Sequence, residues 1–231
     1  MEDKVVVVTG GFGTLGQAVV RAFESAGGRV AVVDRSTVPP ADAARAGERY
    51  LPLGEVDLTR LDHAERAMQS VIGRFGRLDV LVNIAGGFRW QTLLEGDVAG
   101  WDQMYAVNLK TAVVASKAAV PNILKSDAGR VINIGAGAAA KAGAGMGAYT
   151  ASKAGVLRLT ESLSEELKNK GVTVNAVLPG VIDTPQNRRD MPGADRSKWV
   201  PPEAIADVIV FLASPGARAI TGAALPVFGR G

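Results

Sequence analysis

The chain has 231 residues, of which 47% are hydrophobic and 21% are charged, a balance typical of a folded globular protein. Its 26 Lys and Arg residues nearly balance 23 Asp and Glu residues and are scattered, which argues against a nucleic-acid-binding surface. The absence of cysteine excludes disulfides and thiolate metal sites, and the single histidine, His63, excludes a histidine metal cluster and a Ser-His-Asp triad. The sequence carries neither a secretory signal nor a bilayer-spanning stretch, so we expect a cytoplasmic protein without a membrane partner.

Short apolar runs alternate with helical patterns along the chain. The runs predict strands at residues 5–8, 29–33, 50–53, 80–83, 130–134, 172–178 and 224–228. The helical patterns cover residues 14–26, 60–75, 101–124, 147–170 and 202–213. The runs are continuously apolar rather than alternating, which indicates strands buried on both faces. This order predicts an α/β fold: a Rossmann-type doubly wound parallel β-sheet with helices on both faces, in three αβα layers.

The domain organisation follows from the same pattern. No linker or long repeat interrupts the alternation, so we expect one domain over residues 1–231. The stretch at about 184–200 is the most polar and irregular part of the chain. Loops of this kind often close over an active site, so this stretch is the predicted substrate lid.

A glycine-rich turn follows the first predicted strand and opens the first predicted helix. It contains the pattern G-x-G-x-x-G at Gly11, Gly13 and Gly16. Glycines let the backbone approach a pyrophosphate, and the free N–H groups of the following helix point toward it. A tight packing turn is the alternative. The predicted cofactor-binding residues of the turn are Gly10, Gly11, Phe12, Gly13, Thr14, Leu15 and Gly16.

Asp34 ends the second predicted strand, 18 residues after Gly16. A carboxylate at this place accepts hydrogen bonds from the adenosine ribose hydroxyls and repels a 2′-phosphate, which favours NADH over NADPH. NADP remains the alternative cofactor, because the guanidinium of the neighbouring Arg35 can pair with that phosphate.

Tyr149 is followed four residues later by Lys153, which places both side chains on one face of the predicted helix. An ammonium beside a phenol lowers the phenol pKa from about 10 toward neutrality. The pair then suits proton transfer that accompanies hydride transfer to a carbonyl or imine. An ordinary amphipathic helix is the alternative reading of this spacing.

Taken together, these motifs resemble the short-chain dehydrogenases/reductases over the whole chain. The matching pieces are residues 9–16, Asp34, Asp57-Leu58, residues 83–86, Asn108, Tyr149-x-x-x-Lys153, Pro179-Gly180 with Thr184, and Thr221-Gly222. The resemblance implies that Asn108 holds a water that links Lys153 to solvent, and that Tyr149 and Lys153 contact the cofactor as well as the substrate. It implies further cofactor contacts from Asp57, Leu58, Asn83, Ala85, Gly86, Pro179, Gly180, Ile182 and Thr184.

One position departs from the family pattern. Ala136 stands 13 residues before Tyr149, where most members have a serine that hydrogen-bonds the substrate carbonyl. The dihydropteridine reductase branch lacks this serine too, and the shifted glycine turn, residues 85–88 and residues 183–199 are similar to that branch. The resemblance implies an NADH-dependent reductase of a quinonoid or pterin-like substrate. A quinonoid ring accepts hydride readily, whereas a ketone loses about 10²–10³ in rate with a missing oxyanion donor.

The substrate side carries further predictions and alternatives. We expect Ala136, Phe88, Trp90 and Trp199 to face the substrate, with plain packing as the alternative for the aromatic residues. His63 is expected at the solvated surface. The family resemblance implies a homo-oligomer, a dimer or tetramer, paired through the helices at 100–124 and 148–170. A reductase of an ordinary carbonyl and a catalytically weak dinucleotide sensor remain the alternative functions.

Overall fold

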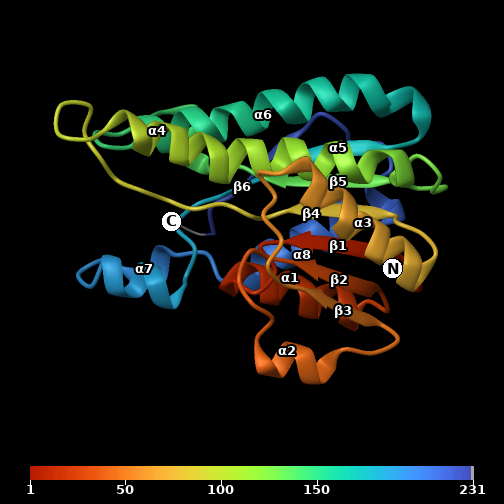
Figure 1. Cartoon of the computed structure of the whole chain (residues 1–231). Helices are drawn as coiled ribbons and strands as arrows, with labels where there is room; N and C mark the ends of the chain where they lie inside the picture. The colour runs from red at the N-terminus through yellow and green to blue at the C-terminus, as the bar shows by residue number, and fades with distance from the viewer. Residues whose placement is uncertain (230–231) are drawn as a thin grey trace.

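The computed structural model describes residues 1–229 and places a parallel sheet at the centre of the molecule (Figure 1). Within this range the sheet has seven strands in the order β3-β2-β1-β4-β5-β6-β7. The strands are β1 (Val5–Thr9), β2 (Arg29–Val33), β3 (Tyr50–Leu53), β4 (Val80–Asn83), β5 (Arg130–Ile134), β6 (Thr173–Pro179) and β7 (Ala224–Val227). The predicted Rossmann-type fold is confirmed, and the predicted strands lie within one or two residues of the observed ones.

The central strand β1 shows why the sheet forms here. All five of its residues are buried, and Val6 pairs in register with Val30 of β2 on one side and Val80 of β4 on the other. The chain moves outward from β1 to β3 and then returns to start again at β4. The loops after β1 and β4 therefore diverge at the carboxyl ends of adjacent strands, where open α/β sheets bind ligands.

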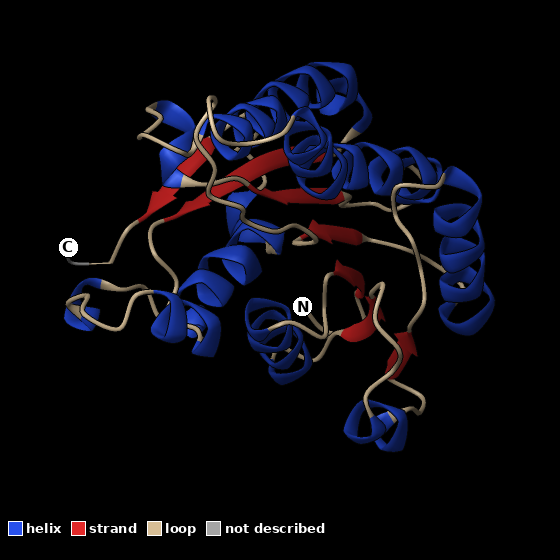
Figure 2. Ribbon diagram, turned by 60° about the vertical axis from the view of Figure 1, so that its left-hand side comes forward, coloured by secondary structure: helices blue, strands red, loops and turns tan. Residues whose placement is uncertain are grey.

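Helices cover both faces of the sheet (Figure 2). On one face, α1 (Thr14–Ser25) and α8 (Pro202–Ala213) pack against the side chains of Val6 and Val8. On the other, α3 (Leu61–Phe75) and α5 (Thr111–Ile123) pack against Val5 and Val7, with α6 (Gly147–Leu167) alongside. Successive strand residues point to opposite faces, so the four valines serve both layers of the core. No helix in residues 1–229 is long and apolar enough to cross a membrane.

The helix predicted at 101–124 is interrupted in the structure. It consists of α4 (Val98–Tyr105), a π-helical turn (Ala106–Lys110) and then α5. A π turn holds an extra residue, which apolar periodicity does not reveal, and such turns are frequent at functional sites. This one carries Asn108.

Two short helices lie where the sequence predicted none. The first, α2 (Pro40–Arg45), is fastened by the buried Asp42, which accepts hydrogen bonds from Gln17 of α1 and Tyr50 of β3. The second, α7 (Pro185–Asp190), begins within the stretch expected to be irregular, because Thr184 caps it through the Asn187 amide. Single 3-10 turns cover Gly137–Ala140, Lys168–Lys170, Arg196–Lys198 and Pro215–Ala217.

Candidate active site

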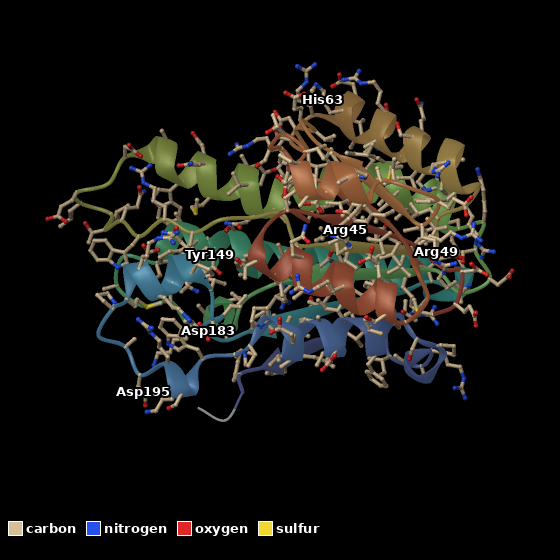
Figure 3. All side chains as sticks on the ribbon, turned by 90° about the horizontal axis from the view of Figure 1, so that it is seen from below. Arg45, Arg49, His63, Tyr149, Asp183 and Asp195 are labelled. Carbon is tan, nitrogen blue, oxygen red and sulfur yellow. The ribbon has the colours of Figure 1, made fainter. Side chains whose placement is uncertain are left out.

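A cleft of about 1150 Å³ opens at the carboxyl ends of the strands. The glycine-rich turn forms one wall, and the loops after β2, β3, β4, β5 and β6 contribute to the others. Figure 3 shows Tyr149 and the segment with Asp183 and Asp195 at one end of the molecule, well away from His63. The cleft therefore unites residues from both ends of the sequence, from Gly10 to Phe228.

The glycine-rich turn has a shape that other residues could not adopt. Gly10 has a φ of +63°, and a β-carbon there would lie 2.9 Å from the backbone of Ala85. A β-carbon on Gly16 would lie within 2.8 Å of three backbone atoms of Gly10 and Gly11. Gly13 is the N-cap of α1 and has no side chain to cap the first turn. The free N–H groups of that turn are thus available to an anion in the cleft.

Asp34 joins the turn to the end of β2. Its carboxylate accepts hydrogen bonds from the Phe12 amide at 3.1 Å and the Ser36 amide at 2.9 Å. Arg35 lies beside it, exposed, and also lines the cleft. Both charges predicted to select between the two nicotinamide cofactors are therefore at the same place in the cleft.

Asp57 and Leu58 line the cleft after β3. Hydrogen bonds from the Thr59 hydroxyl and amide hold the pKa of Asp57 below its ordinary value. His63 accepts a long hydrogen bond, 3.4 Å, from the Asp57 amide through Nδ1 and is half-buried. His63 thus lies partly exposed at the surface, outside this cleft, where the start of α3 meets the loop after β3.

The catalytic candidates Tyr149 and Lys153 both line the cleft from α6. Lys153 is 5% exposed, its ammonium donates to the Ile134 carbonyl at 2.8 Å, and burial lowers its pKa to about 8. Burial raises the pKa of Tyr149 above its ordinary value. The expectation that Lys153 lowers the Tyr149 pKa is not met in this structure, since the ammonium is directed to a carbonyl and desolvation dominates at the phenol.

Asn108 lies behind the cleft wall rather than in it. Its side-chain oxygen accepts from the Gly87 amide at 3.0 Å, and its amide donates to the Gly87 carbonyl at 3.0 Å and to the Ser152 hydroxyl at 3.1 Å. A β-carbon on Gly86 would lie 2.6 Å from this oxygen and 3.5 Å from Nζ of Lys153. Asn108 thus ties the loop after β4 to α6 close to Lys153. The water relay expected there stays a prediction.

The part of the cleft around Tyr149 is largely apolar. Phe88 packs edge to face on Tyr149, with ring centroids 5.0 Å apart and an interplanar angle of 85°. Ala136 lines the cleft with a methyl group where a serine hydroxyl was expected from the family pattern. Lining residues that sequence reasoning did not assign to the substrate include Met146, Val181, Met191 and Phe228, which share no regular spacing.

Besides Asn108, four predicted residues do not line the cleft, each for a structural reason. Gly11 packs against Val32, where a β-carbon would overlap the side chain. Asn83 donates to Asn133 of β5 at 2.8 Å and to Ser116 of α5 at 3.1 Å, so its side chain lies between the sheet and α5. Trp90 donates to the Ala144 carbonyl at 3.0 Å, outside the cleft, and Trp199 is buried, 8% exposed. The remaining predicted cofactor residues line the cleft: Gly10, Phe12, Gly13, Thr14, Leu15, Gly16, Asp34, Arg35, Asp57, Leu58, Ala85, Gly86, Tyr149, Lys153, Pro179, Gly180, Ile182 and Thr184.

Comparison with known proteins identifies the family that uses this arrangement. The family model of the short chain dehydrogenases matches residues 4–194. The chain belongs to this family. It is therefore an NAD(P)-dependent oxidoreductase, which confirms the predicted enzyme class. The likeness to relatives extends over the full chain.

Three relatives show the breadth of that likeness. The chain is 32% identical to a 3-oxoacyl-[acyl-carrier-protein] reductase of Vibrio cholerae, over 99% of this chain and 97% of the relative. It is 34% identical to the enzyme of the same name from Vibrio harveyi, with the same coverage. It is 30% identical to 2-(S)-hydroxypropyl-CoM dehydrogenase 3 of Xanthobacter autotrophicus, over 99% and 96%. None of these three is a pterin reductase by name, so the dihydropteridine reductase branch stays a prediction.

Proposed function

We propose that this short-chain dehydrogenase is an NADH-dependent reductase of a flat conjugated acceptor, such as a quinonoid or pterin-like ring. The observation that carries the proposal is Ala136, a buried methyl group that lines the same cleft as Tyr149, at the place of the expected hydroxyl. The following turn, Gly137–Ala140, also has no hydroxyl side chain. An acceptor that is already electron-poor needs less oxyanion stabilisation than a ketone does.

The cleft fits a dinucleotide on structural grounds. Its volume, the uncapped first turn of α1 and the close approach of Gly16 to Gly10 provide a long site with backbone donors for a pyrophosphate. The residues that would hold the cofactor are those of the glycine turn, Asp34, Asp57 and Thr184. When bound, the reduced nicotinamide supplies the hydride.

Tyr149 is the proton donor in this proposal. Because burial raises its pKa, the phenol is protonated at neutral pH and can donate to an oxygen or nitrogen of the acceptor. Lys153, with a pKa of about 8, is poised to return a proton near physiological pH. Asn108 holds the loop at Gly87 and thereby the wall of the cleft next to both groups.

Asp34 supports NADH as the cofactor. Its carboxylate is fixed at the end of β2 by two backbone amides, and it would repel a 2′-phosphate placed there. Arg35 is the group that would accept NADPH instead, and its exposed side chain is free to approach such a phosphate.

We also propose that residues 184–200 act as a lid. The base of this segment is fixed, since the Asp183 amide donates to the Val200 carbonyl at 2.9 Å and the Val200 amide to the Val181 carbonyl at 2.8 Å. Trp199 anchors the segment to the body, and Met191 reaches the cleft from its far end. Pairing of subunits through α4, α5 and α6 is proposed too, and Val98, Trp101, Tyr105 and Val113 are exposed apolar residues on the first two of these helices.

Reduction of a 3-oxoacyl thioester is the second candidate function. Two relatives of 32% and 34% identity bear that activity in their names. The cleft offers apolar contacts for an alkyl chain from Val181, Met191 and Phe228. This candidate requires reduction of a simple ketone without the serine hydroxyl that most family members have at position 136.

A spectrophotometric screen separates the candidates. NADH and NADPH oxidation would be followed with quinonoid dihydropterin, a quinone, a 3-oxoacyl thioester and a simple ketone. We expect turnover of the conjugated acceptors with NADH. The Ala136→Ser variant should raise ketone turnover by up to about 10²-fold and change the conjugated acceptors much less. Brisk wild-type turnover of the thioester, without turnover of the conjugated acceptors, would overturn the first candidate in favour of the second.

A further inference from the structure

The segment after β4 is hydrogen-bonded to the loop that leads into α6, the helix that carries Tyr149 and Lys153. The indole N–H of Trp90 donates to the Ala144 carbonyl at 3.0 Å, and the Gln91 amide donates to the Gly145 carbonyl at 2.9 Å. Two consecutive residues of one segment thus bind two consecutive residues of the other. Residues 88–91 will be called the strap, and residues 143–147 the entry loop.

Gly145 allows the strap to lie against the entry loop. It has a φ of +72°, and a β-carbon there would lie within 2.7 Å of three atoms of the Trp90 indole. Any other residue would force the indole away and would be strained at this φ. Gly147 makes a similar, looser contact, since a β-carbon there would lie 3.1 Å from the Trp101 ring. The entry loop is therefore shaped to receive the indole of Trp90.

The entry loop continues directly into α6. Gly147 is the first residue of the helix, and Tyr149 lies two residues further on. The Met146 carbonyl accepts hydrogen bonds from both the amide and the hydroxyl of Thr150, each at 2.9 Å. The position of the entry loop therefore sets the first turn of α6, on which the Tyr149 ring is mounted.

The strap reaches Tyr149 from its other end as well. Phe88, two residues before Trp90, packs edge to face on the Tyr149 ring. Trp90 itself is 57% exposed and lies outside the cleft, so it does not act by contact with the substrate. Trp90 contacts the entry loop, which leads to Tyr149 along the backbone, and it belongs to the strap, whose Phe88 contacts the Tyr149 ring.

We propose that Trp90 is a positioning residue for Tyr149. By fixing the strap to the entry loop at Ala144 and Gly145, it sets both the first turn of α6 and the place where Phe88 meets the phenol ring. The inference rests on the proposed role of Tyr149 as proton donor. A misplacement of a reacting group by about 1 Å can reduce a rate by about 10².

The test compares Trp90→Ala, which removes the ring and its N–H, with Trp90→Phe, which keeps a ring. Leu94→Ala is the matched control, because Leu94 is a large apolar residue of the same connection and is 95% exposed. We expect Trp90→Ala to lower kcat about 10-fold to 100-fold with little change in the KM for NADH. Trp90→Phe should restore part of the loss, and Leu94→Ala should behave as wild type. A raised acceptor KM with unchanged kcat would instead show that Trp90 contacts the substrate.

A second readout needs no substrate. The chain has three tyrosines, so the ring carbons of ¹³C-labelled Tyr149, Tyr50 and Tyr105 can be resolved and assigned by NMR. We expect Trp90→Ala and Trp90→Phe to shift the Tyr149 signal and leave that of Tyr50 in place. An unchanged Tyr149 signal in folded protein would refute the positioning role. Failure of wild-type turnover with every acceptor would refute the proposed function alone, since the NMR result does not depend on it.

Discussion

Replacing Lys153 with methionine should stabilise the fold while removing a catalytic group. Lys153 is buried, and burial lowers its pKa from 10.5 to about 8. Since one pKa unit corresponds to about 1.36 kcal/mol, the charged Lys153 side chain destabilises the folded state by roughly 3 kcal/mol. The substitution also removes the hydrogen bond to the Ile134 carbonyl, worth about 1 kcal/mol. We therefore expect Lys153→Met to raise the free energy of unfolding by about 2 kcal/mol at pH 7.

The stability difference between Lys153→Met and wild type should depend on pH. The folded-state pKa of Lys153 lies below the unfolded value, so folding releases a proton between about pH 8 and pH 10.5. The destabilisation is full below pH 8 and fades as the pH rises toward 10.5. The advantage of Lys153→Met over wild type should therefore shrink from pH 7 to pH 10.

Urea unfolding of both proteins at pH 7 and pH 10, followed by tryptophan fluorescence, measures this difference. Lys117→Met is the control, because Lys117 is exposed on α5 and its replacement should change stability by less than about 0.5 kcal/mol. A Lys153→Met protein that is less stable than wild type by the same amount at both pH values would refute the reasoning.

Three further substitutions test other parts of the structure. Asp34→Ala should weaken NADH binding about tenfold in fluorescence titrations and reduce the ratio of the NADH affinity to the NADPH affinity. An unchanged ratio would show that a residue other than Asp34 selects the cofactor. Gly16→Ala should reduce NADH affinity by at least about tenfold in calorimetry while the protein stays folded, because the new methyl group would collide with the backbone of Gly10. Asp79→Asn should lower stability by about 2 kcal/mol at pH 7, since the buried Asp79 carboxylate accepts hydrogen bonds from Arg77. Burial opposes ionisation of Asp79, but the hydrogen bonds hold its pKa below 3.8, so the difference should vanish in unfolding curves as the pH falls through that lowered pKa.

The fold was predictable because the sheet depends on continuous apolar runs, and β1 with its four consecutive valines is the clearest case. The glycine turn and the Tyr149–Lys153 spacing were visible because each is local in sequence. Asn108 was found only through the family pattern, since the π turn that presents it breaks the helical period.

The substrate side was harder to predict, for the opposite reason. Met191 and Phe228 reach the cleft from separate loops, and nothing in their spacing marks them. Trp90 was expected to face a flat substrate, with packing as the alternative, and the structure places its indole against Gly145, outside the cleft. The effect of Lys153 on Tyr149 was misjudged because burial, which the sequence does not show, dominates both pKa values. The cytoplasmic location and the homo-oligomer stay predictions.

The most direct test of the central claim is the Tyr149→Phe variant, assayed with NADH and the best acceptor from the screen. The aromatic ring that packs against Phe88 is retained, and only the hydroxyl, the proton donor, is removed. We predict that turnover falls by about 10²–10⁴ while the Kd for NADH stays within about twofold of wild type. Turnover close to the wild-type rate would contradict the assignment of Tyr149 as the proton donor of this site.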